Sequence, residues 1–188
     1  QKAHIVIIGS GIIGKFNALE LSELGFQVTI IDPAQHQNSS NAALGLLMGN
    51  MYQKRRGRSW DLRKQSIELW PQWITFLQKF NCELNIEKPL IQLTTNEEKF
   101  KKLEKFINEA KDVNLRILEG DSIFIKNINK AFQTNKIKGM ISSEDGRINA
   151  KSLLKTLDKC LRQKKITFVE EEIIKIRKSK NQWISITR

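Results

Sequence analysis

The chain is poor in the residues that build disulfide frameworks and metal sites. Its 188 residues include two cysteines, two histidines, three prolines and one tyrosine. Cys82 and Cys160 lie far apart in the sequence, with no CxxC pair and no histidine close by. We therefore expect no disulfide and no metal site, and we expect both thiols to serve as apolar filling.

The chain also lacks long apolar runs. None approaches the roughly 18 to 20 consecutive apolar residues that span a bilayer, so we expect no membrane span. The apolar stretch at the start lacks the charged flank, the length and the cleavage site of a signal peptide. A cytoplasmic location follows as the default expectation.

Acidic residues are in the minority, 20 against 32 Lys and Arg, which gives a net charge of +12. Such a balance is typical of some nucleic-acid-binding proteins. The clearest cluster is 54–58, whereas Lys151, Lys155 and Lys159 form a solvated stripe on a predicted helix. Three interpretations of the cluster are open: an exposed loop without a ligand, a patch that steers a small carboxylate substrate, and a nucleic-acid contact. We favour the first and do not expect a nucleic-acid partner.

The strongest local signal lies in the first forty residues. Branched apolar residues 5–8 are followed by Gly9-Ser10-Gly11-Ile12-Ile13-Gly14, a G-x-G-x-x-G turn that opens a predicted helix. A second apolar run, 26–31, ends on Asp32, whose carboxylate can accept both hydroxyls of an adenosine ribose. The pattern predicts a β-α-β dinucleotide-binding unit. The expected cofactor-binding residues of this unit are Gly9, Gly11, Ile12, Ile13, Gly14 and Asp32.

The acid and the segment after it narrow the choice of cofactor. A carboxylate at the ribose position would repel a 2′-phosphate, so NAD or FAD is favoured over NADP. The polar stretch 33–38 is then followed by Ser39-Ser40-Asn41-Ala42-Ala43-Leu44-Gly45-Leu46-Leu47. Small residues around a glycine suit a backbone that runs close to a flat ring or a diphosphate, whereas an ordinary NAD domain would continue into another crossover.

At this segment the chain resembles the D-amino-acid oxidase type of FAD-dependent oxidoreductase, and within that family it is most similar to the glycine oxidases. Family members have a Ser/Thr-Ser/Thr-x-Ala-Ala-x-Gly-Met/Leu-Leu segment that wraps the flavin diphosphate and ring. Asn41 stands where the relatives often have serine. The resemblance implies contacts with FAD from Ser39, Ser40, Ala43, Leu44, Gly45 and Leu46.

The resemblance continues further along the chain. Residues 144–150 are similar to the family's Asp-Gly-x-Val-Asp-Pro turn, with Asn149 and Ala150 in place of Asp-Pro. Predicted strands 166–169 and 172–177 resemble the segment whose backbone contacts adenine. The resemblance assigns that adenine contact to Ile173.

The expected fold class is α/β: a Rossmann-like FAD-binding domain with an inserted α+β substrate domain that contains an antiparallel sheet. The FAD-binding domain is expected to comprise residues 1–80 and 140–188, and the first half of the substrate domain residues 81–139. Alternation predicts short strands, and Thr95 with Glu98 predicts a capping box that begins a helix over 96–112. The expected strands of this region are 84–87, 90–93, 113–118, 123–125 and 140–141.

The chain has no initiator methionine and ends at 183–188 within a predicted strand, so we expect a truncated N-terminal fragment. The resemblance implies that most catalytic side chains lie in the missing half, and we assign no catalytic residue. His4 and His36 are expected at the surface or in packing. Tyr52 follows the flavin-wrapping segment, and its exposure to the active site is left open.

The resemblance implies an FAD-dependent oxidase or dehydrogenase that oxidises the C–N bond of a small amine or amino acid by hydride transfer to the flavin. In such enzymes the cofactor performs the chemistry, and the protein orients it and binds the substrate. Two alternatives stay open: an FAD oxidase acting on a modified transfer-RNA base, and a non-catalytic nucleotide-binding module. The substrate, the electron acceptor and the oligomeric state are also open, with a homo-oligomer of the complete protein among the alternatives.

Overall fold

The computed structural model describes residues 3–34, 39–110, 114–119, 123–134, 136–180 and 182–188. The chain divides into two compact units, each built from segments that are distant in sequence. The first unit is Gln1–Leu44, Thr75–Leu84 and Asn149–Arg188, and the second is Gly45–Ile74 and Asn85–Ile148. The expected division into FAD-binding and substrate domains concerns function and stays a prediction. The compact units are divided at other residues, because 45–74 group with 85–148.

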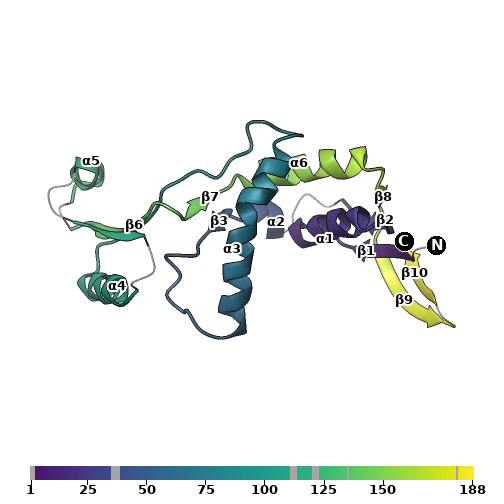
Figure 1. The fold of residues 1–188 in the computed structure, drawn as a ribbon, viewed down its shortest axis with the longest axis horizontal. Helices are drawn as coiled ribbons and strands as arrows, with labels where there is room; N and C mark the ends of the chain where they lie inside the picture. Colours follow the sequence, from purple (N-terminus) through teal and green to yellow (C-terminus); the bar gives the residue numbers. More distant parts are fainter. Residues whose placement is uncertain (1–2, 35–38, 111–113, 120–122, 135, 181) are drawn as a thin grey trace. The chain divides into compact units, whose positions relative to one another are not determined.

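The first unit contains a parallel sheet of three strands (Figure 1). The strands are β1 (His4–Ile8), β2 (Gln27–Ile31) and β8 (Thr167–Val169), in the order β1-β2-β8. Helix α1 (Ile12–Glu23) connects β1 to β2, as the β-α-β prediction required. Because β8 pairs with β2, a segment from far along the chain lies beside Asp32 at the carboxyl end of the sheet.

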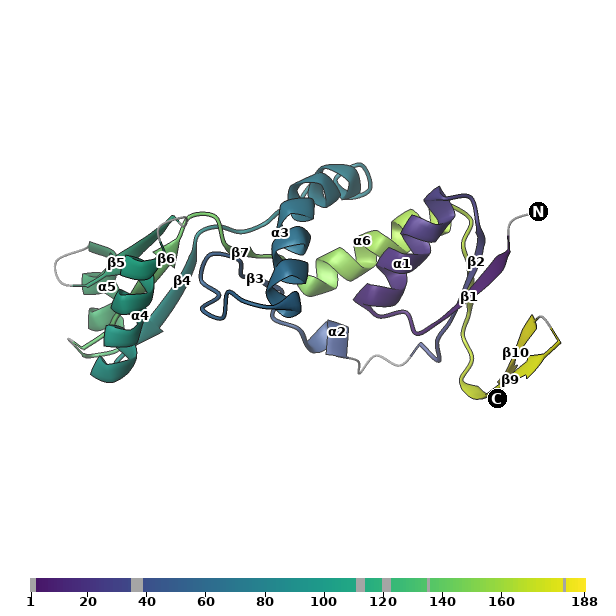
Figure 2. The same cartoon turned by 60° about the horizontal axis from the view of Figure 1, so that its bottom comes forward.

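Helix α6 (Ala150–Gln163) lies alongside α1 in the first unit (Figure 2). It begins at Asn149, whose side chain accepts a 3.0 Å hydrogen bond from the Ser152 N–H. One face buries leucines, and the opposite face exposes the lysine stripe expected from the sequence. The buried apolar residues of this helix are Leu153, Leu154, Leu157, Cys160 and Leu161.

The first unit also contains a short helix and a hairpin. Helix α2 (Ser39–Ala42) has one turn and contacts α6. Strands β9 (Ile173–Ser179) and β10 (Gln182–Thr187) form the antiparallel hairpin, which agrees with the strands expected near the end of the chain.

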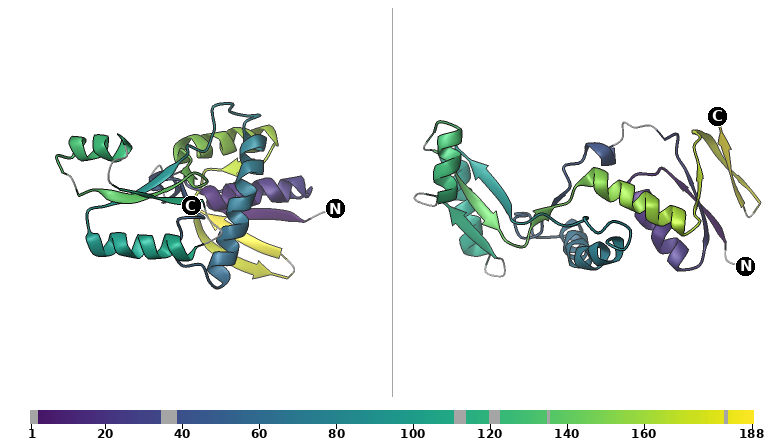
Figure 3. Two further views of the ribbon diagram at one scale, coloured as in Figure 1. Left: turned by 60° about the vertical axis from the view of Figure 1, so that its left-hand side comes forward. Right: turned by 90° about the horizontal axis from the view of Figure 1, so that it is seen from above.

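The second unit is built on an antiparallel sheet of three strands covered by helix α4 (Glu97–Glu109) (Figure 3). The strand order is β4 (Leu90–Thr94), β6 (Lys138–Ser142) and β5 (Leu115–Leu118). A buried cluster between sheet and helix comprises Met51, Leu103, Leu115 and Met140. The remaining elements are β3 (Leu46–Leu47), β7 (Gly146–Arg147), α5 (Ile123–Ala131) and α3 (Arg58–Leu77), most of whose residues belong to this unit.

Several local predictions for this region were wrong. Residues 123–125 begin helix α5, because three apolar residues are too few to separate strand alternation from a helical period. Residues 84–87 form no strand, and only Glu87 makes an isolated bridge, to Arg147. Helix α4 is capped by Asn96, whose side-chain oxygen accepts from the Lys99 N–H at 2.9 Å, and not by Thr95. The strands expected at 90–93 and 140–141 are confirmed, as is 115–118, while 111–113 lie outside the described residues.

The structure also bears on two expectations drawn from composition, the roles of the cysteines and the membrane span. Cys160 is fully buried, but Cys82 is exposed, so apolar filling was the wrong role for Cys82. Neither cysteine forms a disulfide. Among the helices in the described part of the chain, none has the length and hydropathy needed to cross a membrane.

Candidate functional site

The turn between β1 and α1 requires glycine at two positions. Gly9 adopts a φ of +98°, a conformation that side chains disfavour, while its N–H donates to the Ile31 carbonyl at 2.9 Å. A Cβ atom on Gly14 would lie 2.0 Å from the Gly9 carbonyl oxygen. The first and third glycines therefore let the helix begin directly against the strand end, as the motif predicts.

Asp32 lies at the carboxyl end of β2, directly beside this turn. Its Oδ2 accepts a hydrogen bond from the Ser10 N–H at 2.7 Å, and its Oδ1 accepts from the Ala34 N–H at 2.9 Å. The Asp32 N–H donates to the Val169 carbonyl at 3.0 Å, which fixes the residue to β8. Each carboxylate oxygen keeps a further lone pair, so the oriented carboxylate can still accept hydrogen bonds from hydroxyl groups.

Ser40, on α2, lies against the same turn. Its Oγ accepts the Ile12 N–H at 3.0 Å, and a Cβ on Gly11 would lie 3.0 Å from that Oγ. The hydroxyl proton of Ser40 is thereby left to donate elsewhere. Within the described part of the chain, the N–H groups of Gly11 and Ile13 have no acceptor. These donors stand at the start of α1, where the helix dipole favours an anion.

The structure places the other expected cofactor residues outside this group. Ser39 begins α2, and Leu44 is 74% exposed beyond its end. Gly45, with a φ of +72°, and Leu46, paired with Arg147, belong to the second unit. Ile173 pairs with Thr187 in the hairpin. The turn 9–14, Asp32 and Ser40 are thus in contact with one another. The roles in cofactor binding stay predictions for Ser39, Ala43, Leu44, Gly45, Leu46 and Ile173.

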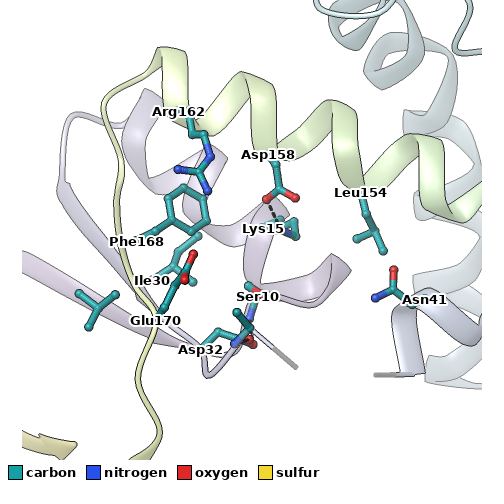
Figure 4. Close-up of a pocket in the computed structure, with 12 residues that line it drawn as sticks. Ser10, Lys15, Ile30, Asp32, Asn41, Leu154, Asp158, Arg162, Phe168 and Glu170 are labelled. Carbon is teal, nitrogen blue, oxygen red and sulfur yellow. Dashed lines mark hydrogen bonds and ion pairs between the residues drawn. The ribbon is translucent and has the colours of Figure 1, made fainter. Parts of the chain in front are cut away.

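A pocket of about 220 Å³ opens beside Asp32 in the first unit (Figure 4). The ends of β2 and β8 and the facing sides of α1 and α6 form its walls. Its lining combines apolar side chains with both signs of charge. The lining residues are Ser10, Lys15, Ile30, Asp32, Ala34, Asn41, Leu154, Asp158, Arg162, Phe168, Val169 and Glu170.

Sequence reasoning missed most of this pocket. Lys15 follows the last glycine of the motif, is buried, and forms an ion pair with Asp158. The Arg162 guanidinium lies 4.9 Å from the centre of the Phe168 ring, and the Lys15 Nζ lies 5.9 Å from it. Asp158 and Arg162 are four residues apart and so share one face of α6. That spacing was visible in the sequence, but the neighbour of that face was not.

The remaining candidate residues have simpler surroundings. His4 hydrogen-bonds Thr29 Oγ1 through Nε2 at 2.9 Å, which agrees with a packing role. His36 lies outside the described residues. Tyr52 stacks on Trp60 in the second unit, with ring centres 6.2 Å apart. Within the described ranges, no group of three or more His, Cys, Asp or Glu side chains could hold a metal ion.

Comparison with known families and structures gives a consistent result. The family model described as "FAD dependent oxidoreductase" matches residues 4–187. The glycine oxidase from Geobacillus kaustophilus is 22% identical, with a TM-score of 0.80 over 97% of this chain and 50% of that one. The glycine oxidase from Bacillus cereus ATCC 14579 is 21% identical, with a TM-score of 0.79 over 100% of this chain and 53% of that one.

A third solved structure extends the range of activities. The iminodiacetate oxidase from Chelativorans sp. BNC1 is 18% identical, with a TM-score of 0.79 over 98% of this chain and 51% of that one. At these identities the likeness shows the fold. The chain spans about half the length of these three proteins. No curated protein sequence matches it.

Proposed function

The chain belongs to the family of FAD-dependent oxidoreductases, and from this premise we propose that the complete protein oxidises the C–N bond of a small amine or amino acid. The likeness to solved glycine oxidases and to an iminodiacetate oxidase supports this proposal. The observation that carries the cofactor part of the proposal is the cradle formed by the β1–α1 turn, Asp32 and Ser40.

The residues of the cradle fit FAD. A Cβ on Gly14 would meet the Gly9 carbonyl oxygen, so helix α1 starts close against β1, as a dinucleotide-binding turn requires. Asp32 would accept the ribose hydroxyls, and the N–H groups of Gly11 and Ile13 would donate to the diphosphate. The Ser40 hydroxyl, fixed by the Ile12 N–H, would donate to the same anion. When bound, FAD supplies the two-electron oxidation of the carbon next to the nitrogen.

We extend the proposal to the residues that only the family pattern implicates. Ser39, Ala43, Leu44, Gly45 and Leu46 would contact the diphosphate and ring, and the Ile173 backbone would contact adenine. Residues 81–139 would belong to the part of the protein that binds the substrate. These roles rest on the match of the family model over nearly the whole chain.

An absorbance spectrum of the purified complete protein tests the proposal, followed by anaerobic addition of glycine, sarcosine and D-alanine. We expect flavin bands that one of these amines bleaches. Absence of flavin after reconstitution with FAD would contradict the cofactor assignment. Another solved structure with a similar fold is that of the L-α-glycerophosphate oxidase from Mycoplasma pneumoniae. Bleaching by glycerol 3-phosphate and by none of the amines would therefore contradict C–N oxidation.

A further inference from the structure

A pocket of about 170 Å³ lies within the second unit. Every residue that lines it belongs to that unit, so its formation needs no residue of the cofactor cradle in the first unit. The pocket combines apolar walls with one side chain of each charge, Lys88 and Glu144. The apolar lining residues are Leu47, Ile67, Trp70, Pro71 and Ile86.

The wall that contains Ile86 and Lys88 is fixed to strand β7. The Glu87 N–H donates to the Arg147 carbonyl at 2.7 Å, and the Arg147 N–H donates to the Glu87 carbonyl at 2.9 Å. A Cβ on Gly146 would lie 2.6 Å from the Ile86 side chain and 3.1 Å from that of Lys88. Glycine in β7 therefore lets this segment pack closely, and the backbone that bears Lys88 is ordered.

The backbone at Glu144 is held by the residue that follows it. Asp145 is 1% exposed, and its oxygens accept three consecutive backbone N–H groups. The Gly49 and Asn50 N–H groups donate to Oδ1 at 2.7 and 2.9 Å, and the Met51 N–H donates to Oδ2 at 2.6 Å. Because Glu144 is bonded directly to this anchored residue, both charged side chains of the pocket extend from fixed backbone.

Helix α3 contributes a wall with an unusual acceptor. Ile67, Trp70 and Pro71 lie within little more than one turn of this helix. Pro71 has no N–H, so it cannot donate to the carbonyl of Ile67, four residues earlier. That carbonyl oxygen lacks its usual helical donor and keeps lone pairs for another partner. Since Ile67 and Pro71 both line the pocket, the acceptor lies in the pocket wall.

Lys88 and Glu144 form an ion pair at this pocket, with Nζ and Oε2 3.2 Å apart. Their side chains are 43% and 58% exposed, so both charged groups still reach water. An exposed pair of this kind adds little to stability and opens at little cost. The pocket thus presents a cation and an anion side by side, next to apolar walls and a carbonyl acceptor.

We propose that this pocket is a binding site for an aromatic amino acid in its zwitterionic form. The carboxylate of the ligand accepts hydrogen bonds from the Lys88 ammonium, and its ammonium donates to Glu144 and to the Ile67 carbonyl. An apolar cavity of about 150 Å³ holds a benzene molecule, so a pocket of about 170 Å³ admits a phenyl ring. The Trp70 indole supplies an aromatic partner for that ring.

Charge complementarity favours a zwitterion over a simple anion or amine. A ligand with a carboxylate alone takes Lys88 from Glu144 and leaves that side chain without its cation, whereas an amine alone does the reverse to Lys88. A zwitterion inserts between the two side chains and pairs with both. The proposal goes beyond the proposed function and does not rest on it, because binding involves neither flavin nor turnover.

Fluorine NMR of the complete protein, labelled with 5-fluorotryptophan, tests the site by titration with L-phenylalanine at low salt and without oxygen. The Trp70 resonance is assigned by its loss in Trp70→Phe. Three analogues each lack one group of the ligand: 3-phenylpropionate lacks the ammonium, 2-phenylethylamine lacks the carboxylate, and glycine lacks the ring.

Two double variants complete the design. K88Q/E144Q removes both charges of the pocket and leaves the net charge unaltered. The control K105Q/E109Q removes an exposed ion pair on α4 of the same unit, whose Nζ and Oε1 atoms are 3.8 Å apart. Because both pairs are exposed, neither variant should change the melting temperature measurably.

We expect phenylalanine to shift the Trp70 resonance and each analogue to bind at least about tenfold more weakly. K88Q/E144Q should weaken phenylalanine binding at least about tenfold, and K105Q/E109Q less than about twofold. Equal affinities in the two variants, or an unshifted Trp70 resonance at about 10 mM phenylalanine, would overturn the site. Equally tight binding of 3-phenylpropionate or 2-phenylethylamine would overturn the assignment of a zwitterion.

This site and the proposed function fail separately. Amines that bleach the flavin, together with phenylalanine binding that K88Q/E144Q leaves unchanged, would refute the site alone. A complete protein that binds phenylalanine through Lys88 and Glu144, but whose flavin no amine bleaches, would refute the proposed oxidation and uphold the site.

Discussion

Lys15 on α1 forms an ion pair with Asp158 on α6, 143 residues further along the chain. The Lys15 side chain is only 7% exposed, whereas that of Asp158 is 37% exposed. The two ends of the pair are therefore unequal: the ammonium depends on its partner for solvation, and the carboxylate still reaches water. Since both residues line the pocket beside Asp32, the pair joins two helices at the candidate cofactor site.

This inequality predicts an asymmetric response to mutation. Asp158→Leu leaves a buried, unpaired ammonium and should destabilise the protein by about 3 kcal/mol, the lower end for a broken buried pair. Lys15→Met leaves a carboxylate that water can solvate and should cost less than about 1 kcal/mol. The double variant should recover most of the loss of Asp158→Leu. Urea unfolding of the four proteins measures the cycle, and a larger loss from Lys15→Met would contradict the argument.

The β1–α1 turn predicts a second difference, between two glycines of one motif. Gly14→Ala places a Cβ 2.0 Å from a backbone oxygen and should destabilise the protein by about 3 kcal/mol or more and abolish flavin retention. Gly11→Ala meets only the Ser40 hydroxyl, at 3.0 Å, and should cost clearly less. Thermal unfolding and the flavin content of the purified variants provide the two measurements. Equal losses would show that the close approach at Gly14 is not decisive.

The sequence predicted those parts of the site that short-range rules determine. The run 5–8, the glycines of the motif and Asp32 lie within one β-α-β unit, whose turn and strand ends follow from local preferences. The strand–turn–helix order and the position of the acid are accordingly confirmed. Ser40 was expected to contact the cofactor, but its hydrogen bond to the Ile12 N–H was not predicted, because it joins segments 28 residues apart.

Long-range packing determined the rest. No local pattern indicated that Lys15 is buried, because its partner Asp158 lies on the distant helix α6. The second wall of the pocket depends on the pairing of β8 with β2, which no local pattern encodes. The helix at 123–131 was missed because its first three residues suit a strand equally well. The residues that surround a cofactor from the far side are therefore the hardest to predict, since they are contributed by distant segments.

Asp32 provides a third prediction. Asp32→Asn keeps the size of the side chain but replaces one acceptor oxygen by an NH₂ group. The Ser10 and Ala34 N–H groups donate to different oxygens of Asp32, so one of them loses its acceptor. Flavin affinity should fall at least tenfold, and stability should fall by about 1–2 kcal/mol. Glu171→Gln neutralises an exposed carboxylate that does not line the pocket and serves as the control. Fluorescence titration with FAD measures both, and equal affinities in the two variants would contradict a specific role for Asp32.

Asp145 should contribute more to the order of the loop at 49–51 than the neighbouring Glu144 does. Asp145→Asn replaces one carboxylate oxygen by an NH₂ group, so the side chain can no longer accept from all of the Gly49, Asn50 and Met51 N–H groups, and the protein should be destabilised by about 2–3 kcal/mol. Glu144→Gln affects only an exposed pair with Lys88 and should change stability by less than about 0.5 kcal/mol. Hydrogen exchange of the 49–51 amides should accelerate in Asp145→Asn alone. Unchanged exchange of the 49–51 amides would show that the stacked rings of Tyr52 and Trp60 suffice to hold the loop.

The two cysteines should differ sharply in reactivity. Burial raises the pKa of the Cys160 thiol; the nearby Lys164 acts in the opposite direction but does not reverse the shift, and Glu23 adds to the rise. Because the thiolate is the reactive form, iodoacetamide at about pH 8 should label the exposed Cys82 and leave Cys160 unmodified until the protein unfolds. Peptide mapping by mass spectrometry distinguishes the two sites.

The raised pKa of Cys160 also fixes the sign of a pH effect, because the native state then binds this proton more tightly than the unfolded chain does. The contribution to stability is fully present below the ordinary thiol pKa of 9.0 and decreases as the pH rises through the folded-state pKa. Cys160→Ala should therefore show a smaller loss of unfolding free energy on going above pH 9.0 than the wild type, whatever its stability at neutral pH. An equal loss in both proteins, or rapid labelling of Cys160 in the native protein, would mean that water reaches this thiol through openings of α6.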